Sequence, residues 1–302
     1  MARDRCRRRR ASGGAAVLAL ELFVQGLVQG SIYALIAVGL TLVYGLLRIL
    51  HVAHAGLFTF GGYLGVLITN GTGSLALALI AAMAVVGVAG MAIYRLCYQP
   101  ILDQPPYVAL IASIGLFIAM EELFRLIFGP YGISYDDPPL QAAIEVLGMR
   151  LKQAEVLAMA GAIVLLGALA ILAEHTPLGL AWRATVTDPQ MATSFGVDIV
   201  WVRYVNFFIG SALAAAAGVM VALLNNLVEP TMGSVPSYKA LAIIVLGGLG
   251  SVPGTLVAAL GLGVIESYGT IYVGHLLDRD AIAFAFLIAV LMVRPQGLLG
   301  RA

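Results

Sequence analysis

Residues 204–228 read Tyr204-Val-Asn-Phe-Phe-Ile-Gly-Ser-Ala-Leu-Ala-Ala-Ala-Ala-Gly-Val-Met-Val-Ala-Leu-Leu-Asn-Asn-Leu-Val228, a run of 25 residues without a charged side chain. A helix needs about 20 apolar residues to cross the hydrocarbon core of a bilayer. This stretch is therefore long enough for one membrane crossing. Similar apolar segments recur along the chain, at residues 17–47, 56–70, 75–97, 107–128, 155–173, 239–274 and 281–293.

The composition indicates the same class of protein. Of the 302 residues, 61% are hydrophobic and only 11% are charged, whereas soluble domains have roughly 45–50% apolar and about 25% charged residues. These figures exclude an ordinary soluble protein, a disordered chain and a disulfide-stabilised secreted scaffold. We expect an all-α integral membrane protein, a polytopic helical bundle of about 8–10 transmembrane segments with broken or re-entrant helices. Residues 17–302 form its single transmembrane domain.

The basic residues indicate how the chain is oriented. Six of the 17 lie in the first ten positions (Arg3, Arg5, Arg7, Arg8, Arg9 and Arg10), and such a cluster before an apolar run usually marks the cytoplasmic side. We therefore expect a basic cytoplasmic segment at residues 1–16, with the 174–203 joint and the tail (Arg294, Arg301) on the same side. That arrangement requires an even number of spans before residue 174, but five apolar segments precede it. Either the first segment doubles back as a hairpin or one segment is re-entrant.

Two apolar segments differ from plain spans. The first is longer than one helix needs and carries four glycines (Gly26, Gly30, Gly39 and Gly45), and the segment 239–274 contains Gly247-Gly-Leu-Gly-Ser-Val-Pro-Gly254. Glycine and proline break helices, and paired broken segments are typical of transport folds with a substrate path between them. For the scattered glycines we favour close helix packing. For the block at 247–254 we favour a true break.

Several ionisable residues lie within or beside the apolar segments. His51 and His54 are three residues apart, which on a helix places them on one face. With no third ligand nearby, we favour a polar lining of a path over a metal pair. Glu121 and Glu122 can both reach Arg125, so an ion pair inside the bundle is favoured over proton-coupled transport or acid–base chemistry.

Three further charged residues have simpler interpretations. Glu266 is buried by its sequence context and has no obvious partner. Glu229 and Lys239 flank a joint that contains proline and glycine, and are interpreted as solvated loop charges.

No signature of a soluble enzyme occurs in the sequence. Lys152 and Lys239 are the only lysines, and neither completes a phosphate-binding G-x-x-x-x-G-K-[ST] loop. H-E-x-x-H, C-x-x-C and G-x-S-x-G are also absent. We expect a non-enzyme with no catalytic residue, no bound metal and no cofactor, and free thiols at Cys6 and Cys97.

The joint at 174–203 is the most informative polar stretch. Thr187 or Asp188 followed by Pro189 predicts the start of a short helix, which would end at Gly196. This helix would expose an apolar patch made of Met191, Ala192 and Phe195. Such a patch suits docking into a partner's groove, but equally a position against the bundle's own cytoplasmic face.

Taken in order, these motifs resemble the branched-chain amino acid ABC transporter permeases, in particular the LivH-type subunit. The resemblance covers nearly the whole chain and rests on five pieces: Ser31-Ile-Tyr-Ala-Leu-Ile-Ala-Val-Gly-Leu-Thr-Leu-Val-Tyr-Gly45, Ile49-Leu-His-Val-Ala-His-Ala-Gly56, Leu178-Gly to Gly196, Gly247-Gly-Leu-Gly-Ser-Val-Pro-Gly254 and Arg294-Pro-Gln-Gly-Leu-Leu-Gly300. The sequence departs from the family's usual pattern at Leu180, where a basic residue is common, and at His51, where Asn is common. Ala55 displaces the glycine that usually follows His54.

The resemblance implies a permease subunit in the inner (plasma) membrane, which pairs with a second related permease. Two ABC ATPase subunits would hydrolyse ATP, and a periplasmic or extracellular binding protein would deliver a branched-chain or other hydrophobic amino acid. Residues 174–203 would then be the coupling loop on the ATPases, through Arg183, Ala184, Asp188, Met191, Ala192, Phe195 and Gly196. Candidate residues of the translocation path are Tyr44, His51, His54, Gly247, Gly248, Gly250 and Ser251.

Other functions remain open at this point. The same superfamily moves urea, amides and sugars. An intramembrane enzyme would use Glu121/Glu122 or His51/His54, and a proton-driven secondary transporter would use the same carboxylates.

Overall fold

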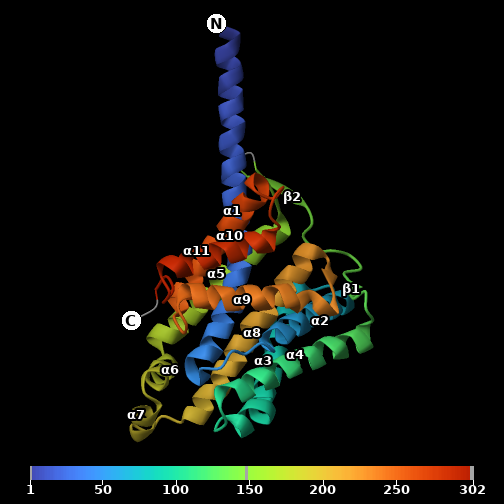
Figure 1. Cartoon of the computed structure of the whole chain (residues 1–302). Helices are drawn as coiled ribbons and strands as arrows, with labels where there is room; N and C mark the ends of the chain where they lie inside the picture. The colour runs from blue at the N-terminus through green and yellow to red at the C-terminus, as the bar shows by residue number, and fades with distance from the viewer. Residues whose placement is uncertain (1, 147–148, 300–302) are drawn as a thin grey trace.

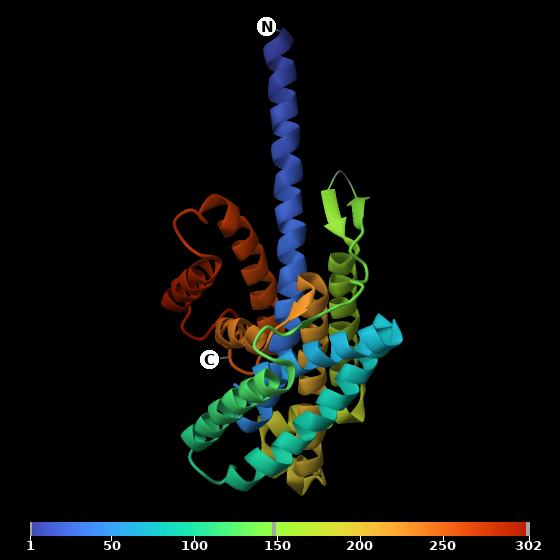
Figure 2. The ribbon, with the colours of Figure 1, turned by 90° about the vertical axis from the view of Figure 1, so that its right-hand side faces the viewer.

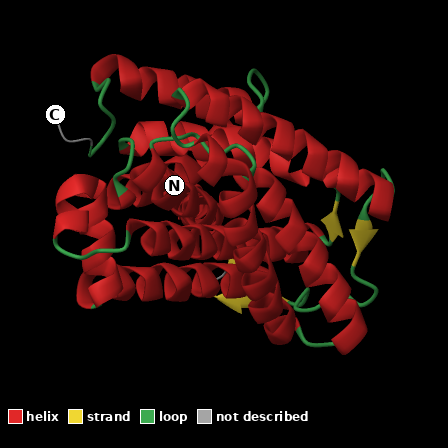
Figure 3. Cartoon of the chain, turned by 90° about the horizontal axis from the view of Figure 1, so that it is seen from below, coloured by secondary structure: helices red, strands yellow, loops and turns green. Residues whose placement is uncertain are grey.

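The computed structural model describes residues 2–146 and 149–299, with side chains described from Leu18 onward. Helices make up most of the chain, and the strands are short (Figure 3). Within the described residues, six helices are long and apolar enough to cross a membrane. They are α1 (Ala2–Leu47), α3 (Leu75–Ile93, continued by a π turn at Tyr94–Tyr98 and a 3-10 turn at Gln99–Ile101), α4 (Pro106–Phe128), α5 (Gln153–His175), α8 (Ile199–Asn225) and α10 (Val252–Tyr272). The expected all-α polytopic bundle is confirmed.

Three further helices of the bundle are shorter: α2 (His54–Thr72), α9 (Ser234–Gly247) and α11 (Arg279–Val293). The 14 residues of α9 span about 21 Å at 1.5 Å per residue, less than the roughly 30 Å of a bilayer core. The predicted break at 247–254 is confirmed, because α9 ends at Gly247 and α10 begins at Val252. Gly248 and Gly250 adopt φ values of 101° and 84°, which disfavour side chains with a Cβ.

The first apolar segment is not broken. Helix α1 runs without interruption for 46 residues, about 69 Å at the helical rise, so the alternative in which the first segment doubles back as a hairpin is wrong (Figure 1). Its glycines serve packing, as predicted. A Cβ on Gly26 would lie 2.6 Å from Val264 Cα, one on Gly30 would lie 2.8 Å from Leu260 Cα, and one on Gly39 would lie 2.7 Å from Gly210 O. Because α10 and α8 support this one helix on two sides, it needs no internal break.

Helices α1 and α8 form the centre of the bundle. In their most apolar stretches, 83% and 78% of the residues are buried, against 17% in each of α4 and α5. Small residues allow this close packing, since Ala34, Ala37 and the run Ala214–Ala217 are fully buried. Helix α10 packs along α1, while α2 and α3 pack on α8 (Figure 2). Helices α4 and α5 therefore lie at the periphery of this single chain.

Two short antiparallel ribbons lie in the connections between helices. Strand β1 (Ile133–Ser134) pairs with β4 (Leu227–Val228), and β2 (Ala143–Val146) pairs with β3 (Met149–Lys152). Asn70 at the end of α2 donates a hydrogen bond from Nδ2 to the Ser134 carbonyl, at 3.0 Å. A 3-10 turn at Pro230–Gly233 then leads from β4 into α9. The β1–β4 ribbon thus joins the ends of α2, α4 and α8, whereas the β2–β3 ribbon leads into α5.

The two ends of the bundle carry different elements. Helices α6 (Pro177–Thr187) and α7 (Pro189–Ser194) lie at the bottom of Figure 1, whereas the N-terminal part of α1 projects from the top. Gly45, near the C-terminal end of α1, faces Val186 of α6. Five helices, α1 to α5, precede α6, and four of these five, α1, α3, α4 and α5, are long and apolar enough to cross a membrane.

The N-terminal part of α1 and helices α6 and α7 lie at different ends of the bundle (Figure 1). The cytoplasmic position expected for both residues 1–16 and the 174–203 joint stays a prediction. A basic cluster indicates which side of the membrane a segment prefers, but it gives no information on how many membrane crossings follow. The tail residues Arg294 to Leu299 lie at the α6 end, where Leu298 N donates to Leu246 O at 2.7 Å. Arg301 lies outside the described residues.

Candidate functional site

A cavity of about 230 Å³ lies beside α1, between α8, α9 and α11. Its wall combines apolar and ionisable side chains. The lining residues are Gln29, Ile32, Tyr33, Ile36, Phe58, Val221, Leu224, Asn225, Val235, Pro236, Lys239, Arg279 and Asp280. We call this cavity the outer chamber. Asn225 ends α8, whose 27 residues place it about 40 Å from the end next to α7, so the chamber lies toward the end of the bundle away from α6 and α7.

A second, closed space continues from the outer chamber along the same face of α1. It has no room for a water molecule and is lined by Ile36, Leu40, His51, Val52, His54, Ala55, Ser237, Ala240 and Leu241. Ile36 borders both spaces. Ile32, Ile36 and Leu40 follow one another at four-residue spacing, which places them on one side of the helix. We call the closed space the constriction.

Both predicted path histidines line the constriction. His51 Nδ1 lies 2.6 Å from the Tyr98 hydroxyl, and His54 Nε2 lies 3.2 Å from the Ile36 carbonyl oxygen. Their ring centroids are 5.7 Å apart. The chain brings them here because α1 ends at Leu47, Arg48 takes a positive φ of 56°, and α2 begins at His54.

Each of these histidines keeps one nitrogen without a hydrogen-bond partner among the described residues. They are His51 Nε2 and His54 Nδ1, and both atoms are buried. A buried polar atom without a partner costs about 1–3 kcal/mol relative to a hydrated one. Admission of water or a polar ligand to the constriction would therefore stabilise an open arrangement at this point.

A cluster of four charged residues lies at the outer chamber, and three of them, Lys239, Arg279 and Asp280, line it. Lys239 Nζ lies 2.9 Å from Glu266 Oε1 and 2.9 Å from Asp280 Oδ1, and Arg279 Nε lies 2.8 Å from Glu266 Oε2. The Lys239 and Glu266 side chains are 3% and 0% exposed. The interpretation of Lys239 as a solvated loop charge is therefore wrong, because α9 begins five residues before it and turns it toward the bundle. We call these four residues the charged cluster.

Tyrosines complete the charged cluster. The Tyr33 hydroxyl on α1 donates to Glu266 Oε2 at 2.8 Å and accepts from Lys239 Nζ at 3.0 Å. The Tyr238 hydroxyl donates to Asp280 Oδ2 at 2.5 Å. The predicted burial of Glu266 is confirmed, and its missing partners come from α1, α9 and α11. A buried charge needs such partners, since breaking a buried pair leaves an uncompensated charge.

The other predicted path residues lie away from the outer chamber and the constriction. Tyr44 is in the last turn of α1, and Gly247, Gly248, Gly250 and Ser251 form the turn between α9 and α10. A Cβ on Gly250 would lie 3.9 Å from Gly45 Cα, which places this turn at the α6 end of α1. Ser251 Oγ accepts a hydrogen bond from Gly254 N at 3.2 Å and begins α10. Together they mark the opposite end of the bundle from the outer chamber.

The 174–203 joint folds into two short helices. The predicted cap is confirmed, because Asp188 Oδ1 accepts from Met191 N at 3.0 Å, and Gly196 takes a φ of 84° just after α7. Met191 and Phe195 are 56% and 82% exposed, as predicted. Ala192 is not part of the exposed patch, since only 4% of it is accessible and its small side chain faces inward.

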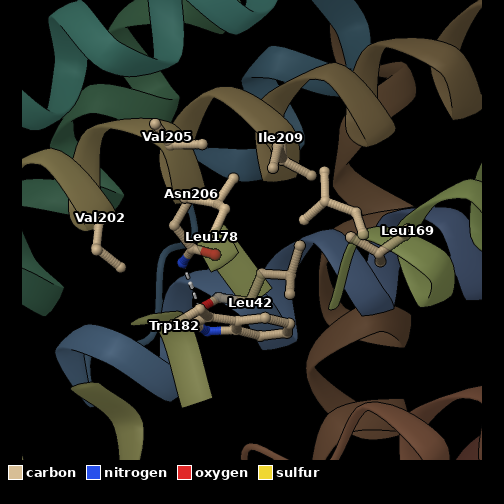
Figure 4. Close-up of a pocket in the computed structure, with 9 residues that line it drawn as sticks. Leu42, Leu169, Leu178, Trp182, Val202, Val205, Asn206 and Ile209 are labelled. Carbon is tan, nitrogen blue, oxygen red and sulfur yellow. Dashed lines mark hydrogen bonds between the residues drawn. The ribbon is translucent and has the colours of Figure 1, made fainter. Parts of the chain in front are cut away.

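Helix α6 connects this patch to the bundle. Arg183 of α6 is exposed and donates to the Ala173 carbonyl of α5, and Ala184 is partly buried on the same helix. Trp182 borders a small pocket with Leu42 of α1 and Leu169 of α5, shown in Figure 4. In that view Asn206 of α8 points at Leu42, whose carbonyl oxygen accepts from Asn206 Nδ2 at 2.6 Å. Helix α6 thus contacts α1, α5 and α8 directly.

The ion pair predicted on α4 is present, but not inside the bundle. Arg125 lies 2.6 Å from Glu122 Oε1 and 3.5 Å from Glu121 Oε1. The Arg125 and Glu122 side chains are 41% and 52% exposed, because this face of α4 points away from the core. The pair lies outside both the outer chamber and the constriction.

Sequence reasoning missed the outer chamber. Tyr33, Arg279 and Asp280 were not singled out, and Lys239 and Glu266 were interpreted separately. The available signal was a lysine and a glutamate within the same apolar segment, 239–274, since intramembrane charges usually pair. The order of helices in space, which brings α1, α9, α10 and α11 together, is not contained in hydropathy.

Comparison with known proteins agrees with this architecture. A family model described as "Branched-chain amino acid transport system / permease component" matches residues 22–293. The Escherichia coli K12 high-affinity branched-chain amino acid transport permease LivH is 32% identical over 93% of this chain and 96% of its own length. BraD of Pseudomonas aeruginosa is also 32% identical, with the same coverage. The second E. coli permease, LivM, is 26% identical over 89% of this chain and 68% of its own length. The chain is a multi-pass membrane protein and belongs to the branched-chain amino acid transport permease family.

Proposed function

We propose that this chain is the LivH-type permease subunit of an ATP-driven importer for branched-chain or other hydrophobic amino acids. Its similarity along almost the full length of LivH and BraD carries the proposal. The weaker similarity to LivM, a second permease of the same E. coli transport system by its name, supports pairing with a related permease. Two ABC ATPase subunits would hydrolyse the ATP, and a periplasmic or extracellular binding protein would deliver the substrate.

Helices α6 and α7 are the proposed coupling segment on the ATPases. The exposed Met191 and Phe195 side chains support this role, because they offer an apolar anchor that the chain itself leaves uncovered. The segment around this anchor is shaped by Arg183, Ala184, Asp188, Ala192 and Gly196. Trp182 fixes α6 against the bundle, so a force applied to α7 reaches the path helices.

The groove along α1 is the proposed half of the translocation path. The outer chamber has a volume of about 230 Å³. The constriction with His51 and His54, which has no room for a water molecule, closes it on the α6 side. ATP binding by the partners would shift the subunit between states in which the constriction is closed and open. The turn with Tyr44, Gly247, Gly248, Gly250 and Ser251 would form the inner end of the path.

The sidedness follows from the coupling segment. ATP is a cytoplasmic nucleotide, so α6 and α7 would face the cytoplasm and the outer chamber would face the binding protein. The N-terminal part of α1 would then lie on the outer side of the inner membrane. This proposal replaces the cytoplasmic position of residues 1–16.

The function is tested by reconstitution. The chain is co-purified with its second permease and ATPases, placed in proteoliposomes, and supplied with binding protein and radiolabelled leucine. ATP-dependent accumulation of leucine supports the proposal. If the proteoliposomes accumulate urea, an amide or a sugar but no leucine, the membership of the superfamily would stand and the proposed substrate class would be overturned. Uptake without ATP, driven by a proton gradient, would overturn the ABC mechanism.

A further inference from the structure

We infer that the outer chamber binds the substrate as a zwitterion, with Arg279 on its carboxylate, Asp280 on its ammonium group and the apolar wall around its side chain. This inference rests on the proposed function and adds the binding residues. It uses only groups that line the outer chamber. The remaining members of the charged cluster, Lys239 and Glu266, are positioning residues.

Arg279 has unused donors that face accessible space. Its Nε is engaged by Glu266 Oε2 at 2.8 Å, and its side chain is 45% exposed. Within the described residues, its two terminal nitrogens have neither a hydrogen bond nor an ion pair. A guanidinium group whose terminal nitrogens are free binds a carboxylate through two parallel hydrogen bonds. Glu266 holds the Arg279 side chain in place for that contact.

Asp280 has unused acceptor capacity next to Arg279. Lys239 Nζ lies 2.9 Å from its Oδ1, and the Tyr238 hydroxyl donates to its Oδ2. A carboxylate offers about four lone-pair sites, so these two contacts orient the group without saturating it. Its side chain is 44% exposed. An ammonium group entering the outer chamber can therefore bind Asp280.

The charge balance favours a zwitterion over a singly charged ligand. The charged cluster contains two cations, Lys239 and Arg279, and two carboxylates, Glu266 and Asp280. A ligand with one positive and one negative group leaves this balance unchanged. A free amine or a free carboxylate would add an uncompensated charge in a partly desolvated site, which is unfavourable. Lys239 cannot serve the substrate itself, because it already contacts Glu266, Asp280 and Tyr33 and is only 3% exposed.

The apolar wall fits a branched side chain. Ile32, Phe58 and Leu224 are among the residues that line the outer chamber. Its volume of about 230 Å³ equals that of about eight water molecules at roughly 30 Å³ each. Leucine has nine non-hydrogen atoms, so one leucine matches the space. Urea would leave the apolar wall hydrated, and a sugar would place hydroxyl groups against it.

The test is photocrosslinking in the reconstituted complex with photo-leucine, a leucine analogue in which a diazirine loses N₂ on irradiation and the carbene inserts into a neighbouring C–H bond. We expect adducts on the peptides that carry Ile32, Ile36, Val221 and Leu224. Excess leucine should abolish them, whereas 3-methylbutylamine and 4-methylpentanoate, which each lack one charged group, should compete at least tenfold more weakly. Arg279→Gln should lower labelling about tenfold or more, because it removes a charge-assisted hydrogen-bond pair, and Arg279→Lys should restore part of it.

Two further variants separate binding from folding. Val221→Phe fills the outer chamber from α8 without touching the charged cluster and should also abolish labelling. Arg125→Gln, at an arginine that pairs with two glutamates outside the chamber, is the matched control and should label normally. Suppose that the wild-type complex takes up leucine normally. Adducts found only outside the outer chamber, or labelling that is unchanged in Arg279→Gln and Val221→Phe, would then overturn this inference and leave the proposed function intact. Failure of wild-type uptake would instead count against the proposed function.

Discussion

The Tyr33 hydroxyl donates a hydrogen bond to Glu266 Oε2 at 2.8 Å, although 233 positions separate the two residues in the chain. This contact joins α1 to α10 at the level of the outer chamber. It also places the first helix of the bundle in the same polar network as α9 and α11, through Lys239 and Arg279. The stability of the bundle and the shape of the outer chamber therefore depend on the same carboxylate.

Replacement of this carboxylate should strongly destabilise the subunit. Glu266→Gln leaves Lys239 and Arg279 without a full counter-charge, and breaking a buried pair costs about 3–5 kcal/mol. The measurement is the thermal unfolding midpoint of the purified complex in detergent. Glu122→Gln, which removes one partner of an exposed pair, should cost at most about 1 kcal/mol.

A double replacement checks the physical reason for this loss. Lys239→Met with Glu266→Leu removes both buried charges and fills their space with apolar groups, which recovers much of the stability of such pairs. We expect the double variant to unfold at a higher temperature than Glu266→Gln. An equal or lower midpoint would show that hydrogen bonding, and not charge balance, dominates here.

Close contact between helix backbones makes a second prediction. A Cβ on Gly61 would lie 2.4 Å from Ala215 Cα, so Gly61→Ala should force α2 away from α8 and reduce the yield of folded subunit. Gly167→Ala is the matched control, because nothing lies within 4 Å of its Cβ position. That change should be neutral or stabilise α5 by roughly 0.5–1 kcal/mol. The yield after size-exclusion chromatography in detergent measures both. Equal yields would mean that α2 and α8 repack freely.

The turn between α9 and α10 should be needed for transport and not only for folding. Replacing Gly248 and Gly250 with Leu forces side chains onto positive φ values of 101° and 84°. We expect the subunit to remain in the membrane while leucine uptake stops. Gly261→Leu on α10, where the Cβ position is open, serves as control. Uptake at the normal rate in the double glycine variant would reduce this turn to a packing element.

The coupling segment should lose its ATPases when its anchor is removed. Truncating a buried interface aromatic commonly costs about 2 kcal/mol or more, so Phe195→Ala should co-purify poorly with the ATPases or uncouple hydrolysis from uptake. Arg183→Ala should give a weaker and salt-sensitive defect, to which loss of its contact with Ala173 O contributes. Tyr131→Ala, at another exposed aromatic (86%), should assemble normally. Normal assembly and coupling of a Phe195→Ala, Met191→Ala double variant would rule out α7 as the docking element.

The orientation of the bundle can be measured with single cysteines. Both native cysteines are first removed by Cys6→Ser and Cys97→Ser. The single cysteines Asp137→Cys and Ser194→Cys are then introduced. Asp137 lies next to β1 and Ser194 lies on α7, at opposite ends of the bundle. A membrane-impermeant maleimide should label Asp137→Cys in intact cells and Ser194→Cys only after permeabilisation. The reverse pattern would place α6 and α7 outside, where they could not meet cytoplasmic ATPases.

The sequence allowed the helices to be located, but not their neighbours. Segments such as 107–128 and 281–293 agree closely with α4 and α11, because the length of an apolar run is fixed by the membrane and is local information. The cap at Asp188 and the break at 247–254 are local too. The interpretation of Lys239 was wrong and the partners of Glu266 were missed, because the identity of a buried charge's partner depends on which helices meet. The side of the membrane on which the first ten residues lie stays a prediction, because a basic cluster alone does not give the number of crossings that follow it.

The backbone contact between α1 and α10, at Gly26 and Gly30, constrains how this subunit can move. Where the main chains of two helices touch directly, no side chain lies between them that could change rotamer and let one helix slide past the other. We therefore expect α1 and α10 to move as one rigid unit. We expect the motion that opens the groove to come from α9, a 14-residue helix with a 3-10 turn at one end and a glycine turn at the other. We therefore expect α1 and α10 to stay fixed relative to each other while α9 moves. A cross-link between α9 and α1 should hold the groove closed without disturbing the contact between α1 and α10.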